Sequence, residues 1–449
     1  MMDSIANKLS RTKYTSVWIV LGLLHNLTIY LTHHKRSLSR FLCAYTLLYI
    51  FTHRRTAIGV TPRKDLKSPG GSLPLVGDIV KMTFQPRTEV YQLNEKIHKE
   101  VGRVFAITLP FVGRVVDFTD PAVLEHVLKT NFWAYEKGEF LRRTFFDLLG
   151  NGIFSADGHS WNWQRKMASH IFNVSAFRHY TSEVFVKESY IVADYLGMIA
   201  EEERTVDIHK LFYLYTLDSF GEISFGQSFG CLDSPEEGTV EFAEAFDRLN
   251  TIVFNRVFTP GWQLTEFLTS RGRQIRKDKQ TIASFALKII RDRRIHGYDK
   301  PQKDLLQLCM DMQDVEDGRR LSDEVLKDMV LNFIIADGTR IYKGEFASWS
   351  SWTMGRDTTI WGPDAREYDP DRWMTGEKFP AHKFPAFHAG PRKCLGQQFA
   401  TVEAITILAI LLQRFTFELV DPDTEPEYIP GLTLPMANGL PLRVHQRPV

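Results

Sequence analysis

Apolar residues recur every three or four positions through most of this 449-residue chain, which predicts a largely helical protein. Four long segments follow this pattern: 155–179, 182–203, 207–225 and 239–257. A fifth begins after Cys394, has apolar residues from Phe399 to Leu412 on one face, and is predicted to run to Gln413. Pro121 is predicted to open a shorter helix because proline suits a first helical turn.

Strands are predicted near both ends of the folded body. Apolar and polar residues alternate in Arg103–Leu109 and Arg114–Phe118, with a glycine between them that suits a turn. The same alternation appears in Phe415–Leu419, directly after the last long helix. Asn438-Gly439 lies between two apolar runs and predicts a hairpin turn. The fold class expected is therefore mainly α with small β-sheets.

Residues 1–60 differ from the rest of the chain and are predicted to form an N-terminal membrane anchor. Val17–Leu31 is mostly apolar and has basic residues on both sides. As a helix it would cover about 22 Å of a hydrocarbon core roughly 30 Å thick, so its flanks must help it to span. A shorter apolar run, Phe41–Phe51, is predicted to lie at the membrane interface. A cleaved signal peptide and a buried soluble helix are the alternatives.

Prolines and glycines in residues 61–78 predict a stiff linker after the anchor. Residues 79–449 are predicted to form one large catalytic domain.

Charge and cysteine content exclude some classes of protein. Lys and Arg number 55 and Asp and Glu 54, a net charge of +1, which argues against nucleic acid as a partner. The four cysteines are widely scattered and show no zinc-ligand or disulfide spacing, so a reducing compartment is expected.

The segment Phe387–Gly396 (FHAGPRKCLG) concentrates the candidate chemistry. It places Cys394 at the expected start of a helix, where backbone N–H groups favour a thiolate, the form of cysteine that binds iron. Gly390 permits a backbone turn, and Gly396 leaves room for a flat macrocycle. Arg392 can bind a carboxylate, and Phe387 can shield the sulfur from water. Alternatively, Cys394 is a small buried apolar residue, or His388 is the iron ligand.

These residues match F-x-x-G-x-R-x-C-x-G, the haem-binding signature of the cytochrome P450 family, at all five specified positions. The resemblance implies a haem, iron protoporphyrin IX, whose axial ligand and only protein metal ligand is Cys394, with Arg392 near a propionate. Trp161 and Arg165 are similar to the family's Trp-x-x-x-Arg pair, which implies that they also contact propionates. Residues 138–158 resemble the membrane-bound branch that hydroxylates fatty acids and alkanes.

The chain departs from the family pattern after Glu324–Ala336, which resembles the first half of the helix that crosses the haem. At Asp337 it continues with a segment that resembles the strand which, in the family, follows the Glu-x-x-Arg helix. The oxygen-handling acid and threonine are missing, so no catalytic residue is named, and an internal deletion at 336–337 is predicted. The strings at 355–359 and 201–204 match the missing motifs only by coincidence. Arg372 is expected to lack its ion-pair partners.

The resemblance implies a haem-dependent monooxygenase that hydroxylates a lipophilic substrate, such as a fatty acid or alkane, with O2 and electrons from NADPH through a reductase. The endoplasmic reticulum membrane, with the catalytic domain in the cytosol, is the expected location. Two alternatives remain: a non-catalytic haem-binding remnant or incorrectly joined gene product, and a haem-thiolate isomerase or dehydratase.

Overall fold

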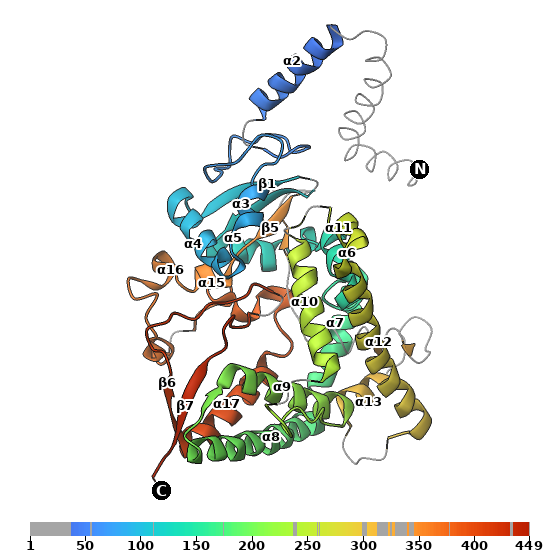
Figure 1. Ribbon diagram of the computed structural model, residues 1–449, viewed down its shortest axis with the longest axis vertical. Coiled ribbons are helices and arrows are strands. Elements are labelled where there is room, and N and C mark those ends of the chain that lie inside the picture. The colour runs from blue at the N-terminus through green and yellow to red at the C-terminus, as the bar shows by residue number, and fades with distance from the viewer. Residues whose placement is uncertain are drawn as a thin grey trace. The chain divides into compact units, whose positions relative to one another are not determined.

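The computed structural model describes residues 37–448 except 54–55, 111, 174, 237–239, 258, 260, 299–302, 312–321, 324–325, 328–338, 341–344, 377 and 432–433. The apolar run at 17–31 and most of the helix expected at 324–336 therefore lie outside the described residues. The chain divides into two compact units (Figure 1). The first comprises the residues up to 85, 93–120 and 340–350, and the second comprises 86–92, 121–339 and 351–449.

The first unit contains the sheet predicted from the alternating residues. β1 (Val104–Leu109) and β2 (Gly113–Phe118) are antiparallel, which confirms both predicted strands. β5 (Phe346–Ser348) pairs parallel with β2. The segment after Asp337 therefore contains a strand, as its resemblance to a strand segment predicted. The strand order is β1-β2-β5-β4, with β4 at Thr339–Arg340.

Among the described residues, three α-helices precede β1 along the chain: α2 (Ser37–Thr52), α3 (Ile79–Phe84) and α4 (Val90–Val101). α2 contains the apolar run predicted to lie at a membrane interface, and its Leu47, Leu48 and Phe51 side chains are exposed. Within the described part of the chain, no helix combines the length and the apolar character needed to cross a bilayer.

The second unit is mainly helical, as the sequence predicts. Its helices include α5 (Pro121–Glu125), α6 (Gly138–Leu149), α7 (Gly158–Asn173), α8 (Ser175–Glu201), α9 (Ile208–Phe225), α10 (Glu241–Arg256), α11 (Trp262–Leu268), α12 (Ser270–His296), α13 (Leu305–Met310), α15 (Ser351–Met354), α16 (Thr358–Trp361) and α17 (Gln397–Arg414). Local chemistry sets the ends of α9: the Asp207 carboxylate accepts from the N–H groups of His209 and Lys210, and Gly226 closes the helix at a φ of 74°.

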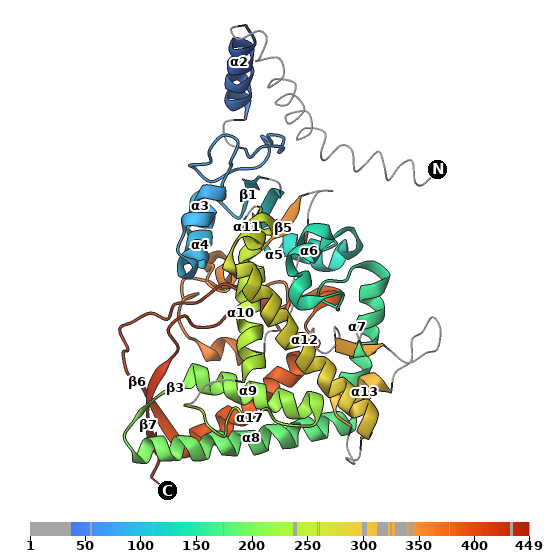
Figure 2. The same ribbon diagram turned by 45° about the vertical axis from the view of Figure 1, so that its right-hand side comes forward.

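Two apolar layers hold these helices together. α8, α9 and α17 lie side by side in both ribbon views (Figures 1 and 2) and bury Leu196, Leu214 and Leu411 between them. α10 packs on α6 and α12 around Leu249, which is fully buried. Since α17 follows the cysteine segment directly, its packing fixes the end of that segment in the second unit.

A three-stranded sheet of order β3-β7-β6 joins distant parts of this unit. β6 (Phe415–Leu419) is the strand predicted after the last long helix, while β3 spans Thr205–Asp207 and β7 spans Pro441–Gln446. The hairpin predicted around Asn438-Gly439 is wrong in its pairing, because β7 pairs with β6 and β3. The Asp207 carboxylate accepts the Leu440 N–H at 2.8 Å and so ties the start of β7 to β3.

Neither literal motif string lies within the body of a long helix, as the sequence indicated. Residues 355–359 run from the end of the short helix α15 into the first residues of the short helix α16, and residues 201–204 comprise the last residue of α8 and the turn after it. Arg372 was expected to lack its family partners, and the structure gives it a local partner in their place. Its guanidinium pairs with Asp364 at 2.8 Å and lies over the Trp361 ring, because the local turn supplies a carboxylate in place of a distant helix.

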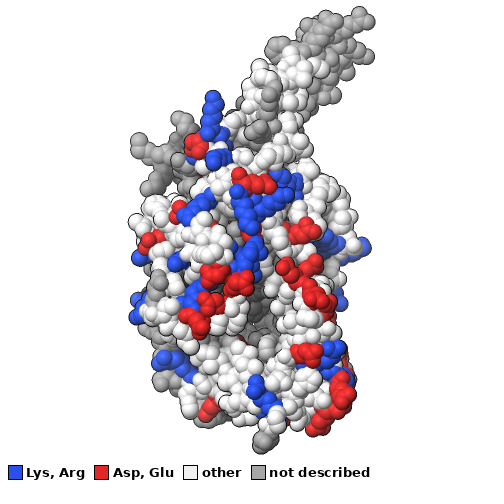
Figure 3. Space-filling model, turned by 90° about the vertical axis from the view of Figure 1, so that its left-hand side faces the viewer, with Lys and Arg blue, Asp and Glu red and all other residues white. Residues whose placement is uncertain are grey.

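Charges of both signs are interspersed over the described surface shown in Figure 3. Elsewhere among the described residues, charges pair within one helix, for example Lys99 with Glu95 at 2.8 Å. This face therefore presents a mixed surface rather than a field of one sign, in keeping with the net charge of +1.

Glu403 on α17 provides a test of this packing. Burial raises the pKa of its carboxyl to about 8, so folding stability falls as the pH rises from about 4.5 toward 8. Glu403→Gln should therefore raise the free energy of unfolding at pH 8 by about 1–3 kcal/mol and give little gain at pH 4.5. Urea unfolding at the two pH values measures this. The exposed Glu418→Gln is the control and should change stability by under about 0.5 kcal/mol.

Candidate functional site

The cysteine segment is an irregular loop held by its own backbone. Short turns at Pro385–Phe387 and Gly390–Arg392 precede it, and the Cys394 N–H donates to the Phe387 carbonyl at 2.9 Å. Cys394 was expected in the first helical turn, but α17 begins at Gln397 with Gly396 as its N-cap. The loop turns tighten the chain before the helix starts, so the sulfur lies just ahead of the helix N-terminus.

The two glycines of this loop have different surroundings. Gly390 has a φ of +64°, and a Cβ there would lie 1.9 Å from the Leu128 carbonyl oxygen. The loop is thus pressed against the π-turn His126–Thr130, and only glycine fits. A Cβ on Gly396 would meet only the Cys394 sulfur, at 3.9 Å. Gly396 therefore leaves open space beside the sulfur, as a flat cofactor requires.

The sulfur of Cys394 differs from the other thiols in exposure. Cys394 is partly exposed, whereas Cys231 and Cys309 are buried and burial raises the pKa of each to about 12. Those two thiols are kept neutral in the core and suit packing rather than metal binding. Cys43 is exposed on α2. Among the four, Cys394 alone lies in a polar loop with arginines nearby.

Asp157, just before α7, and Trp161 and Arg165 on α7 contact the loop. The Asp157 carboxylate pairs with the Arg392 guanidinium at 2.9 Å, and that guanidinium lies 4.7 Å from the centroid of the Trp161 ring. Arg165 donates from Nη2 to the carbonyl of Lys393. Because residues four apart share a helix face, Trp161 and Arg165 support the loop from one face of α7, and Asp157 supports it from the residue that precedes the helix.

Arg392 is nearly buried, with 9% of its side chain exposed. Besides Asp157 and Trp161, its guanidinium lies 5.5 Å from the Phe132 ring centroid and 3.5 Å from the Ala156 carbonyl. These contacts from two ring faces and two acceptors fix the position of the cation. Trp161 is itself 4% exposed and packs with Phe132 in a small apolar cluster.

Arg165 is the second cation at this site. Burial lowers the pKa of its guanidinium, the nearby Cys394 sulfur raises it, and Arg392 lowers it. Cys394 and both arginines are therefore close enough to interact electrostatically. Two guanidinium groups beside a thiol form a place for a ligand with acidic groups and a thiolate-binding metal.

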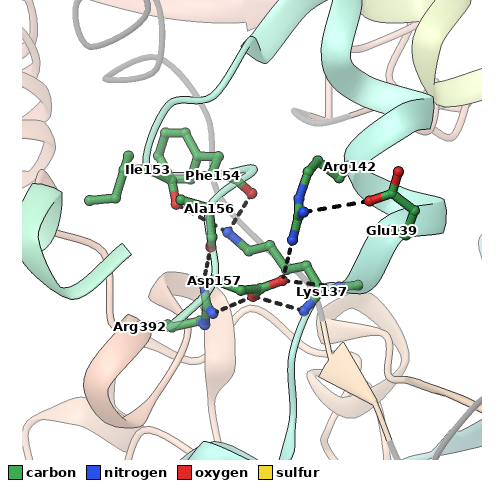
Figure 4. Close-up of polar contacts among 9 residues, drawn as sticks. Lys137, Glu139, Arg142, Ile153, Phe154, Ala156, Asp157 and Arg392 are labelled. Carbon is green, nitrogen blue, oxygen red and sulfur yellow. Dashed lines mark hydrogen bonds and ion pairs between the residues drawn. The ribbon is translucent and has the colours of Figure 1, made fainter. Parts of the chain in front are cut away.

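Asp157 is the residue that sequence reasoning missed. It lay inside the Trp161 motif, four residues earlier, but the sequence alone gave it no role. Figure 4 shows its carboxylate between Arg392, Arg142 and the start of α6. It accepts from the backbone N–H groups of Lys137 and Gly138, each at 3.0 Å, and lies 3.5 Å from Arg142.

The other predicted residues are placed as follows. The Phe387 ring is 36% exposed, and its role as a shield for the sulfur stays a prediction. His388 is buried in the loop with Nδ1 2.8 Å from the Ala389 nitrogen, and its φ is +60°. The site thus brings together Cys394, Arg392, Trp161 and Arg165, and it fits haem: a thiol for the iron, two cations for the propionates, and a bare glycine beside the sulfur.

A family model for cytochrome P450 matches this chain over residues 68–337 and 336–440. The chain belongs to the cytochrome P450 family. Its fold, mainly helical with small sheets, agrees with that membership, and haem is the cofactor of this P450 monooxygenase.

Relatives from a fungus and plants are similar to most of the chain. It is 28% identical to cytochrome P450 monooxygenase cyp1 of Mycosarcoma maydis, covering 90% of this chain and 79% of that protein. It is 28% identical to cytochrome P450 704C1 of Pinus taeda, covering 83% and 92%, and 25% identical to cytochrome P450 94A2 of Vicia sativa, covering 90% and 96%.

These alignments are longer than the part of this chain that they contain. The fungal alignment runs over 508 positions, although 90% of the 449 residues, about 404, take part. About 100 positions therefore have no counterpart in this chain, and the pine alignment, over 482 positions with 83% of the chain, gives a similar excess. The two stretches of the family match meet at 336–337, where the sequence departs from the family pattern.

Gly390 allows a test of the loop geometry. Gly390→Ala should distort the cysteine loop for two reasons. The added Cβ would lie 1.9 Å from the Leu128 carbonyl oxygen, and alanine would have to adopt the unfavourable φ of +64°. Gly376→Ala is the matched control, with a φ of +78° and nothing within 4 Å of its Cβ. We expect the control to lower stability by about 1 kcal/mol and Gly390→Ala by several kcal/mol. Equal losses in thermal unfolding would contradict the packing described.

Proposed function

We propose that the chain represents a monooxygenase that hydroxylates a lipophilic substrate of the fatty acid or alkane class, with Cys394 as the axial ligand of the haem iron. Arg392, Arg165 and Trp161 would hold the propionates, Gly390 and Gly396 would shape the loop, and Phe387 would shield the sulfur. The observation that carries this proposal is the shared support of the cysteine loop by Trp161 and Arg165 on one face of α7.

Each residue has a physical task in this proposal. When bound, haem supplies the oxygen and electron chemistry, with the thiolate increasing electron density at the iron. Arg392 and Arg165 would neutralise two carboxylates in a partly buried setting, where charge-assisted hydrogen bonds are strong. The loop backbone would hold the sulfur next to the space that Gly396 leaves open by having no side chain.

Electrons would come from NADPH through a reductase, and the protein would act at the endoplasmic reticulum membrane with its catalytic part in the cytosol. The exposed apolar side chains of α2 support a location at a lipid surface, because water solvates such a run poorly. The substrate class is supported by residues 138–158, which form α6 and the segment leading to α7.

A specific observation favours a second reading, in which this polypeptide is an incorrectly joined product without turnover. Besides the divided family match at 336–337, α17 exposes a stripe of apolar side chains that share one face: Val402, Ile405, Leu408 and Leu412 are 42%, 62%, 44% and 50% exposed. We propose that the missing segment of about 100 residues covers this stripe and completes the haem pocket.

The iron ligand can be tested by spectroscopy. The protein completed with the proposed missing segment, when reduced and bound to carbon monoxide, should show the red-shifted Soret band of a haem thiolate, and Cys394→Ser should remove it because a hydroxyl does not replace the thiolate. Cys309→Ser is the matched control, since its thiol is buried in the core away from this loop. An unchanged band in Cys394→Ser would refute the assignment.

The join and the reaction can be tested together. We expect the transcript to encode an extra segment between Ala336 and Asp337, and we expect the chain as written to incorporate little haem. The protein with that segment should bind haem close to one per chain and convert lauric acid or dodecane to hydroxylated products only with NADPH, reductase and O2. Full haem content without the segment would contradict the second reading. Product formation without NADPH and O2 would favour an isomerase or dehydratase.

A further inference from the structure

We infer that Asp157 is the positioning residue for Arg392: it orients the guanidinium that, on the proposed function, binds a haem propionate. No role for Asp157 follows from family membership or from the sequence motif. The inference rests on the contacts that the carboxylate makes in the second unit, most of which are drawn in Figure 4.

The carboxylate of Asp157 is itself held rigidly. Its Oδ1 accepts from the Lys137 N–H and its Oδ2 from the Gly138 N–H, so both oxygens are oriented by backbone at the start of α6. Its side chain is 6% exposed. A carboxylate with two backbone donors has little freedom to rotate, and its remaining hydrogen-bonding direction is therefore fixed.

Arg392 receives its orientation from this carboxylate. Nη2 donates to Oδ1 at 2.9 Å, while the guanidinium carbon lies 4.7 Å from the centroid of the Trp161 ring. The cation–π contact and the charge-assisted hydrogen bond hold the guanidinium from two sides. Together they restrict a side chain that has several rotatable bonds.

Burial makes this pair important energetically. Arg392 and Asp157 are 9% and 6% exposed, so removing the negative charge would leave a guanidinium in the interior without its nearest counter-ion. Loss of one partner of a buried pair is strongly destabilising, so we expect the remaining side chain to move toward water. The Ala156 carbonyl, 3.5 Å away, is at the limit of hydrogen-bonding range and cannot replace a carboxylate.

Charge balance around the sulfur points the same way. Arg165 and Arg392 are like charges at the same loop, because Arg165 donates to the carbonyl of Lys393, the residue between Arg392 and Cys394. Asp157 offsets one of them, which allows both cations to stay near the loop before an acidic ligand binds. Asp157 thus prepares the cationic site in advance and reduces the reorganisation that binding requires.

Chemical labelling of arginines tests the positioning without any cofactor. In the full chain, Asp157→Asn should raise the rate of phenylglyoxal modification of Arg392, followed by mass spectrometry, at least five-fold. Arg256, which is buried and paired with Glu266 and Asp147, is the internal reference and should not change. Asp147→Asn is the matched control variant, because Asp147 is a carboxylate of α6 that pairs with a different arginine, Arg256. It should leave the Arg392 rate unchanged.

Two outcomes would overturn the inference. An unchanged Arg392 rate in Asp157→Asn would show that the carboxylate does not hold the side chain. Equal increases at Arg392 and Arg256 would show general loosening of the unit rather than positioning. Asp157→Glu should restore part of the slow Arg392 rate, because it keeps the charge.

A haem arm separates this inference from the proposed function. In the protein completed with the proposed missing segment and loaded with haem, Asp157→Asn should speed haem transfer to a scavenging apoprotein about ten-fold, and in an Arg392→Gln background it should speed the transfer by less than two-fold. If Asp157→Asn speeds haem transfer by the same factor with and without Arg392, the link to Arg392 is overturned. If Cys394→Ser leaves the spectrum unchanged while Asp157→Asn still exposes Arg392, the proposed function fails and the positioning of Arg392 stands.

Discussion

The placement of the cysteine loop on the first turns of α7 is the constraint on which the site depends. A loop with two short turns and a glycine at positive φ has little regular hydrogen bonding of its own. Its position comes from one buried ion pair, one guanidinium stacked on an indole and one arginine that donates to its backbone. Two of these contacts come from one face of α7, through Trp161 and Arg165, and the third comes from Asp157, just before the helix.

α17 provides the other support for this loop. It anchors the loop's far end by burying Ile407 and Leu411 against α8 and α9, and it leaves another stripe of apolar side chains exposed. The same helix therefore has one face fully used and one face without a complete cover among the described residues. That asymmetry, the divided family match and the long alignments all support the proposal of an internal segment that this chain lacks.

Electrostatics distinguish the functional thiol from the structural ones. Cys231 and Cys309 are enclosed by apolar neighbours that oppose ionisation, while Cys394 lies in a polar loop with two guanidinium groups within electrostatic reach. Asp157 limits the excess of positive charge there. The site thus combines one sulfur, two cations and one fixed carboxylate, and the carboxylate organises the cations rather than the sulfur.

The sequence by itself determined the helical class, the pairing of β1 with β2 and the residues of the cysteine loop, because helical and strand periodicities and short motifs are local properties. Only the tertiary structure decided which distant residues meet. It gave β7 its partners β6 and β3, and gave Asp157 its place between α6 and Arg392. These contacts join segments up to hundreds of residues apart, and their energies depend on burial that no local pattern encodes.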